Sequence, residues 1–324
     1  MTTAQATEHG ASRTPYFQPR RLGHVNLVVQ DVDRSMAFYK SVVGLEEAYV
    51  QPKNRAGFLS NGNTHHDIGM VESAGPLGFG RKPGLNHTAF ELETEVDMVR
   101  GYERALDDQV SFLRSADHDI AHSIYGKDPD GNLYEIYADV IRDWRAARHG
   151  VVTKPKPNWR PGMTPPLAER NYDPAPELRR VQSAIFHPRR TASVALVLEN
   201  FEAGVDYYQR IIGLTLLAGG RDAAFAVLGG TLGERNLSLF RALRGQRPGL
   251  HHIGYEAWDD ADLDASVARL RATGSAPALE VETPLRRAVY IRDPDGLRLQ
   301  FYVDRGRPAA EWSACDPDAA LLLA

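Results

Sequence analysis

Two histidines and one glutamate on three separate predicted strands could bind a metal ion together. His24, His87 and Glu135 are separated by 63 and 48 residues, so only a folded structure can bring them into contact. Two imidazoles and one carboxylate on one face of a metal leave neighbouring coordination positions open, as in non-haem Fe(II) oxygenases. Zinc hydrolases use a similar set, so the ligand types alone leave the metal open. Taken singly, each of these residues is more typical of a scattered strand histidine or a surface carboxylate than of a metal ligand.

An internal repeat indicates how the chain could bring them together. The segment 21–45 has a counterpart at 190–214. Further on, GLNHTAFELE and KDPDGNLYEIYAD recur as GLHHIGYEAW and RDPDGLRLQFYVD, both 165 residues later. Two ungapped blocks at one offset predict that residues 21–140 and 190–305 are copies of one module.

The two copies differ in the residues that could bind a metal. The counterparts of His24, His87 and Glu135 in the second copy are Ser193, His252 and Gln300. The second copy therefore lacks the carboxylate and one imidazole, and six of the 11 histidines lie in the first copy. This difference predicts a metal-bearing catalytic module at 21–140 and a degenerate, metal-free module at 190–305.

Hydrophobic patterning divides each copy into two similar halves. VNLVV and VALVL are typical of half-buried strands. Apolar residues then recur at helical spacing from Val32 to Val43, with Asp33 expected to cap this helix and Gly44 expected to end it. A strand, a second amphipathic helix and strands joined by a DPDG turn repeat the order. The predicted fold class is α+β, with four βαβββ units paired into two modules.

The segments outside the two copies carry weaker signals. Prolines crowd the connector, residues 141–189, and exclude long helices and central strands from it. Trp144 and Trp159 are expected to anchor this connector as an extended, wrapped segment. Residues 1–20 and 306–324 are expected to be N- and C-terminal tails without an assigned structure.

Composition excludes several classes of protein. The length of 324 residues suits two domains, and a net charge of −4 argues against a non-specific nucleic-acid binder, which needs a basic face. A single cysteine, Cys315, excludes an intrachain disulfide and a cysteine-rich zinc site. No apolar run approaches the roughly 20 residues of a membrane span, and the N-terminal stretch lacks the apolar core of a signal peptide. We expect a cytoplasmic protein with no nucleic-acid or membrane partner.

The motifs around the candidate residues resemble those of the vicinal oxygen chelate superfamily. These motifs are GHVNLVV with His24, NTHHDIGM with His65 and His66, LNHTAF with His87, and DHDIAHSIYGKDPDGNLYEIY with Glu135. Within the superfamily, the chain resembles the two-module extradiol ring-cleavage dioxygenases of the catechol 2,3-dioxygenase type. The resemblance covers both modules and implies glyoxalase/dioxygenase-like folds, each built from two βαβββ units.

The resemblance implies a role for each matching residue. His24, His87 and Glu135 match the three metal ligands, and the metal implied is Fe(II), occasionally Mn(II). His66 matches a histidine that moves protons and stabilises bound dioxygen. Tyr125 matches a tyrosine that hydrogen-bonds the metal-bound diol oxygen, although Tyr290 at the same register in the second module leaves a packing role open.

For four further residues near the predicted site, the resemblance implies a role less directly. His118 matches another active-site histidine, but many relatives have it slightly earlier, where this chain has Ala116. Variants that place it as here usually have a glycine next, where this chain has Asp119. His65, Asp119 and His122 are predicted to contact substrate, and for His122 a plain polar role near the pocket is the preferred interpretation.

The reaction implied by the resemblance is Fe(II)-dependent extradiol (meta) cleavage of a catechol-type aromatic diol with O₂. Histidines suit it chemically, because a pKa near 6.5 lets them move protons at neutral pH. In many two-module relatives the metal lies in the C-terminal module, whereas the ligands here lie in the N-terminal one. The contacts to the substrate therefore do not transfer. The implied partners are a small aromatic diol, O₂ and further copies of the chain in a homo-oligomer.

Two other kinds of function stay open on the same fold. One is a glyoxalase-like metal-dependent lyase or isomerase, or a thiol-transferring resistance enzyme. Glyoxalases usually have four protein ligands, including two glutamates, and lack the paired histidines. A metal-free binding protein of the bleomycin-sequestering kind would not need three ligands kept together in one module. Consumption of O₂ and colour formation with a catechol would separate these functions.

Overall fold

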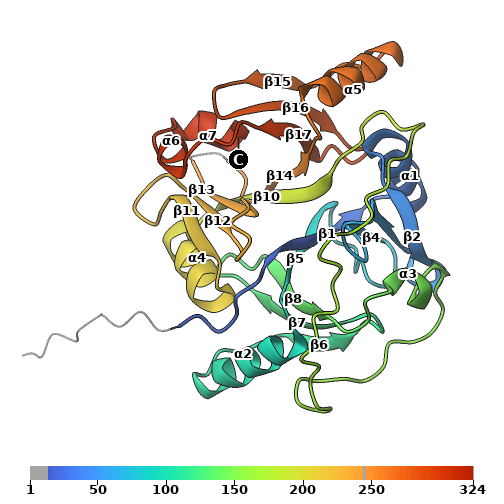
Figure 1. The fold of residues 1–324 in the computed structure, drawn as a ribbon, viewed down its shortest axis with the longest axis vertical. Helices are drawn as coiled ribbons and strands as arrows, with labels where there is room; N and C mark the ends of the chain where they lie inside the picture. Colours follow the sequence, from blue (N-terminus) through green and yellow to red (C-terminus); the bar gives the residue numbers. More distant parts are fainter. Residues whose placement is uncertain (1–13, 244–245, 324) are drawn as a thin grey trace, which may run out of the picture.

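The computed structural model describes residues 14–243 and 246–323 and contains two mixed β-sheets. Figure 1 shows the sheet of the first module below that of the second, with strands β1 (Arg21–Val29) and β10 (Arg190–Leu198) near the middle of the molecule. The predicted α+β class with two repeated modules is confirmed. Residues 1–13 of the predicted N-terminal tail lie outside the described part of the chain.

In the first module, the order strand, helix, three strands occurs twice. After β1, its elements are α1 (Val32–Phe38), β2 (Glu46–Gln51), β3 (Ala56–Ser60), β4 (Ile68–Glu72), β5 (Gly84–Glu91), α2 (Glu95–Asp107), β6 (Arg114–Asp117), β7 (Ala121–Lys127) and β8 (Leu133–Asp139). The strand order is β6-β7-β8-β5-β1-β4-β3-β2, with the short strand β9 (Gly150–Val151) at the edge. The two units join where β1 pairs antiparallel with β5.

The second module repeats this arrangement. After β10, its elements are α4 (Phe201–Tyr207), β11 (Thr215–Gly219), β12 (Phe225–Gly229), β13 (Leu237–Arg241), β14 (Gly249–Glu256), α5 (Asp260–Ala272), β15 (Leu279–Glu282), β16 (Arg286–Arg292) and β17 (Arg298–Asp304). The strand order is β11-β12-β13-β10-β14-β17-β16-β15, with β10 antiparallel to β14 at the centre. The four predicted βαβββ units are therefore all present.

The central strands of the two modules have the same irregularities. The β1–β5 register shifts between Leu22 and His24, and the β10–β14 register shifts between Thr191 and Ser193. Such bulges re-aim the side chain that follows them. The same local backbone therefore presents His24 in one module and Ser193 in the other.

The start of α1 differs from the sequence prediction. Asp31, with an extended backbone, is the N-cap, and its side chain accepts a hydrogen bond from the backbone N–H of Arg34. Asp33, the predicted cap, lies inside the first turn, where a carboxylate still interacts favourably with the helix dipole. The end was predicted correctly: Gly44, at φ 92°, follows a π-helical turn over Tyr39–Val43.

The DPDG turns connect the modules reciprocally. The Tyr39 hydroxyl donates to the Asp293 carboxylate at 3.2 Å, and the Tyr208 hydroxyl donates to the Asp128 carboxylate at 3.1 Å. Asp128 and Asp293 are the first aspartates of the two DPDG motifs. The repeated tyrosine and the repeated DPDG turn thus have a packing role that does not depend on a metal site.

The connector lies against the first module. It begins with α3 (Trp144–Ala147) and β9, which pairs parallel with β2. Trp159 is buried, and its ring stacks on His122 with the centroids 4.1 Å apart. The described connector contains neither a long helix nor a central strand, as its prolines predicted.

The C-terminal segment forms two helices on the second module, α6 (Ala309–Ser313) and α7 (Pro317–Leu323). Trp312 is fully buried and packs in one apolar cluster with Val227 and Phe240 of the second sheet. The sequence had left this segment without a structure. Across the two described stretches, no helix is long and apolar enough to cross a membrane.

Candidate metal centre

Three neighbouring strands place His24, His87 and Glu135 side by side. β1 pairs with β5 and β5 with β8, so that Ala89 lies opposite both His24 and Glu135. The Nε2 atoms of His24 and His87 lie 3.3 and 2.9 Å from Oε2 of Glu135. One potential ligand atom from each residue lies within 4.8 Å of the others. This spacing suits one ion with ligand distances of about 2.0–2.2 Å.

The three side chains are buried, and the pKa values of His24 and Glu135 are shifted in the direction that metal binding requires. Loss of hydration lowers the pKa of His24 to about 4, so its imidazole is neutral at pH 7. Burial opposes ionisation of Glu135, but hydrogen bonds and charge from His24 and His87 outweigh it and hold its pKa well below the usual value. Metal ligands must be deprotonated. The neutral His24 imidazole and the ionised Glu135 carboxylate, with the His87 imidazole beside them, therefore fit a divalent ion such as Fe(II) or Mn(II).

His118 and Tyr125 lie beside this centre, as predicted. Nε2 of His118 is 3.0 Å from the Tyr125 hydroxyl and 4.0 Å from Oε1 of Glu135. The Arg114 guanidinium lies over the Tyr125 ring, 3.6 Å from its centroid. Burial lowers the pKa of His118 and raises the pKa of Tyr125, so both side chains are neutral at pH 7. The pair can hold one oxygen of a ligand at the metal position.

His66 lies on another side of the centre. Its ring is 4.0 Å from that of His24 and 5.0 Å from that of Phe58, centroid to centroid. Although it is buried, neither ring nitrogen has a hydrogen-bond partner among the described residues. Burial lowers its pKa well below the usual value. An unpaired buried imidazole is costly, and a ligand in the adjacent space would satisfy it.

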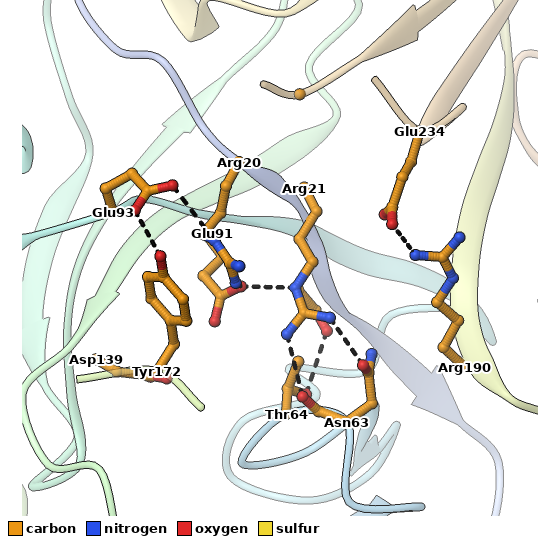
Figure 2. A network of polar contacts seen from close by, with 12 residues as sticks. Arg20, Arg21, Asn63, Thr64, Glu91, Glu93, Asp139, Tyr172, Arg190 and Glu234 are labelled. Carbon is orange, nitrogen blue, oxygen red and sulfur yellow. Dashed lines mark hydrogen bonds and ion pairs between the residues drawn. The ribbon is translucent and has the colours of Figure 1, made fainter. Parts of the chain in front are cut away.

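A polar network around Arg21 fixes the loop at Asn63 and Thr64 (Figure 2), which directly precedes the paired histidines His65 and His66. The Arg21 guanidinium donates to the Glu91 carboxylate at 2.7 Å and to the side-chain and main-chain oxygens of Asn63 at 2.8 and 3.1 Å. The Thr64 hydroxyl then donates to the His66 carbonyl at 2.6 Å. Arg21 therefore holds the loop at Asn63, and this loop positions the paired histidines His65 and His66. Sequence reasoning missed Arg21, because an arginine at the start of a strand carries no signal of this role.

His65 forms a wall between two cavities. Its Nδ1 lies 3.1 Å from Oδ1 of Asp139. It lines the cavity of about 680 Å³ next to the metal-ligand set and also a smaller cavity of about 210 Å³ that Arg21 lines. With His24 and His66 it forms a second group of ligand atoms within 4.8 Å, which shares His24 with the first.

Asp119 and His122 were predicted to contact substrate, but neither lines the cavity of about 680 Å³. The Asp119 carboxylate pairs with Lys154 at 2.7 Å and with Arg148 at 3.3 Å. Asp119 has φ 65°, a left-handed conformation that glycine adopts easily and aspartate tolerates. Nδ1 of His122 lies 2.6 Å from the Glu95 carboxylate beneath the stacked Trp159 ring. Both side chains are held by structural partners.

A cavity of about 680 Å³ opens above the metal-ligand set. Part of its wall is apolar and aromatic, including Tyr49, Phe58 and Val71. The connector supplies another part, residues 152–156. The volume lies within the range typical of small-molecule sites. Ligands in the N-terminal module allowed the connector to border the site, and the structure shows that it lines the cavity.

In the second module, side chains fill the place equivalent to the metal position, and a smaller cavity of about 430 Å³ lies beside Tyr290. The Gln300 amide nitrogen donates to the Tyr290 hydroxyl at 2.8 Å and to the Leu322 carbonyl at 3.2 Å. Arg286, 1 % exposed, donates to the Gln300 carbonyl oxygen at 3.2 Å. At the register of Arg286, the first module has Ala121, which lines the open cavity.

Comparison with known proteins identifies the family of both modules. Residues 21–136 and 190–301 match the Glyoxalase/Bleomycin resistance protein/Dioxygenase superfamily. The chain belongs to this superfamily. Each matched segment corresponds to one module, so both copies of the repeat are members in sequence as well as in fold.

Two characterised relatives match one module's length of the chain. A biphenyl-2,3-diol 1,2-dioxygenase 3 from Rhodococcus globerulus is 31 % identical over 125 residues, covering 37 % of this chain and 63 % of the relative. A catechol-2,3-dioxygenase from Bacillus subtilis (strain 168) is 24 % identical over 140 residues, covering 42 % and 48 %. The match thus spans about half to two thirds of the length of these relatives.

Solved structures match both modules together. The Mn(II)-bound glyoxalase from Novosphingobium aromaticivorans has a TM-score of 0.65 at 15 % identity, covering 90 % of this chain and 84 % of that one. The 2,3-dioxygenase LapB from Pseudomonas sp. KL28 has a TM-score of 0.63 at 14 % identity, covering 89 % and 93 %. At these identities the likeness establishes the two-module fold.

Proposed function

We propose that this protein is an extradiol dioxygenase that opens the ring of a catechol-type diol with O₂, using Fe(II) bound by His24, His87 and Glu135. The observation that carries the proposal is the buried set of two imidazoles and one carboxylate at a cavity with an aromatic wall. Membership of the superfamily and two dioxygenases among the relatives support it.

Three protein ligands on one face leave room for both reactants. A ferrous ion bound there would supply Lewis acidity toward the diol oxygens and electron exchange with O₂. The overall reaction balances without a further reductant, because the diol supplies the electrons and both oxygen atoms enter the product. Mn(II) has the same preference for nitrogen and oxygen donors and would fit the same three residues.

The neighbouring residues of the chain handle the substrate and its protons. The neutral Tyr125 phenol can donate a hydrogen bond to an ionised diol oxygen, and His118 orients it through the 3.0 Å contact. The unpaired ring nitrogens of His66 can hold or release a proton on the other side of His24. Acid–base catalysis of this kind contributes about 10²–10⁴-fold to a rate.

The cavity wall positions the ring and excludes water. Phe58 and Tyr49 stack on each other with centroids 4.3 Å apart, and both line the cavity. A flat aromatic substrate fits against such a surface. Holding the diol and O₂ at neighbouring positions is itself a large part of the catalytic effect expected here.

The test is anaerobic reconstitution with Fe(II), followed by O₂ uptake and visible absorbance with a panel of catechols. We expect one O₂ consumed per diol and a yellow product with wild type and with Ser193→Ala, and neither with Glu135→Ala. Tight metal binding without O₂ uptake on any diol would contradict the proposal and favour a metal-dependent lyase or isomerase. Absence of metal binding would contradict the site itself.

A further inference from the structure

We infer that the second module binds a small apolar carboxylate in the cavity of about 430 Å³ beside Tyr290, and that Arg298 binds the carboxylate group. The volume of this cavity lies within the range typical of small-molecule sites. The inference goes beyond the proposed reaction, because it concerns a binding site in the module that lacks the metal ligands.

This cavity is the counterpart of a part of the cavity in the first module. Several residues that line it stand 165 positions after residues that line the cavity of about 680 Å³. These pairs, with the first module named first, are Asn86 and His251, Tyr125 and Tyr290, and Leu133 and Arg298. The second module therefore keeps space beside the place where Gln300 and Arg286 fill the metal position.

A segment that follows each module in the sequence completes each cavity. Residues 152–156 of the connector line the cavity of the first module, and Leu321 and Leu322 of α7 line that of the second. The Tyr290 hydroxyl donates to the Leu322 carbonyl at 2.8 Å, and Trp312 packs in one buried cluster with Leu323. The α7 wall is thus held by the packed structure and needs little further ordering when a ligand binds.

The charged side chains that line this cavity are both positive. They belong to Arg292 and Arg298, and no described carboxylate lines the cavity. Their printed hydrogen-bond partners are neutral, because Arg292 donates to the Gly296 carbonyl at 2.8 Å and Arg298 donates to His251. A ligand with one negative group would balance part of this charge.

The positive charge also lies on a different strand from that of the first module. Arg114 of β6 lines the first cavity, and its register partner on β15 is Leu279. Conversely, Arg298 of β17 stands at the register of Leu133 on β8. The second cavity therefore has its own arrangement of apolar and charged groups and is not a weakened copy of the first.

His251 holds the Arg298 guanidinium at the cavity. Arg298 donates to Nε2 of His251, and Nδ1 of His251 lies 2.7 Å from Nδ1 of His252. Loss of hydration, together with the charge of Arg298, lowers the pKa of His251 to about 4, so its imidazole is neutral at pH 7. This imidazole orients the guanidinium without balancing its charge. A guanidinium has five N–H donors, so others can bind both oxygens of a carboxylate.

The apolar part of the lining determines the rest of the ligand. Leu279, Ile291 and Leu321 line the cavity with the Tyr290 ring. Burial of an apolar body against them contributes about 25 cal/mol per Å². A small ring with one carboxylate places its charge at Arg298 and its ring against these side chains.

Two ligands of the same shape, benzoate and benzamide, test the inference because they differ in charge. Binding to the Fe(II)-loaded full chain is measured anaerobically by calorimetry. Arg298→Met removes the charge, and Ala278→Trp fills part of the cavity, which Ala278 lines. Arg210→Met removes an exposed arginine of the same module that does not line the cavity and is the control. Glu135→Ala removes the proposed metal site of the first module.

We expect wild type to bind benzoate about tenfold more tightly than benzamide, as for a charge-assisted contact of about 1.4 kcal/mol. Arg298→Met should abolish this preference, and Ala278→Trp should weaken the binding of both ligands. Arg210→Met and Glu135→Ala should bind both ligands as wild type does.

Three results would overturn the inference. The first is that wild type does not bind benzoate or binds both ligands equally. The second is that Arg298→Met keeps the preference. The third is that Glu135→Ala loses the binding of benzoate while Ala278→Trp keeps it, which would place the carboxylate at the metal position. Since benzoate is not a diol, none of these results depends on ring opening, and failure of the proposed reaction would leave this site standing.

Discussion

The two modules have the same arrangement of strands and helices, but different side chains occupy the space beside their central strands. In the first, Ala121 leaves a cavity open next to His24, His87 and Glu135. In the second, the Arg286 side chain fills the same register and hydrogen-bonds Gln300. The C-terminal helix α7 closes that place further through the Leu322 carbonyl. The fold therefore determines where a site can form, and a few side chains determine whether it does.

The histidine common to both modules gives the largest expected effect on turnover. His87→Gln should reduce turnover more than about 100-fold by removing a metal ligand, since even partners of ligands cost 10–100-fold when lost. His252→Gln, at the equivalent register, should leave turnover per bound metal unchanged. Metal content and O₂ uptake of both variants provide the measurement. A similar loss in both would show that the second module also takes part in the reaction.

His66 gives the next largest effect. His66→Gln should lower kcat about 100-fold while the metal stays bound, because its proposed role is proton movement rather than ligation. Its counterpart in the second module is Arg235, which pairs with Asp304. Arg235→Gln should leave kcat unchanged. Steady-state kinetics with metal analysis separates the two roles, and loss of metal from His66→Gln would contradict the assignment.

The paired tyrosines should differ about tenfold. Tyr125→Phe removes a hydrogen bond to a charged diol oxygen and should lower kcat/KM about tenfold. Tyr290→Phe should leave turnover intact and lower the free energy of unfolding by about 1 kcal/mol, because its hydroxyl bonds Leu322 and Gln300 inside the structure. Kinetics and urea unfolding measure both values. If Tyr125→Phe and Tyr290→Phe had equal effects on kcat/KM, the role of Tyr125 would be packing, as it is for Tyr290.

Trp312 should have the smallest effect on turnover. Trp312→Ala leaves a cavity in the cluster beneath the C-terminal helices and should cost about 3–5 kcal/mol of stability. Turnover per bound metal should stay at the wild-type level below the unfolding transition, because these helices cover the second module. Loss of turnover without loss of stability would place the C-terminal segment in the function of the first module.

Sequence alone predicted the fold well, because the information was periodic or duplicated. The repeat at an offset of 165 residues identified the four units, and the differences at Ser193 and Gln300 singled out the first module. The structure brings the three predicted ligands together, with His66, His118 and Tyr125 beside them. Their roles stay proposals.

What the sequence could not predict depends on contacts between distant segments. Arg21 holds the loop of His66 through Asn63, and Lys156 lines the cavity because β9 and Trp159 anchor the connector. Asp119 and His122 lie in the same motif as His118, but ion pairs of Asp119 and a hydrogen bond between His122 and Glu95 turn both toward structural partners. Residues that are neighbours in one motif therefore have side chains that point to different places, and the sequence did not show this.

The most direct test of the difference between the modules is the number of Fe(II) ions bound per chain under anaerobic saturation. The account predicts one ion for wild type, none for Glu135→Gln, and one for Gln300→Glu, whose module still has serine in place of His24. Two ions per chain in wild type, or an ion kept by Glu135→Gln and lost by Gln300→Glu, would contradict it.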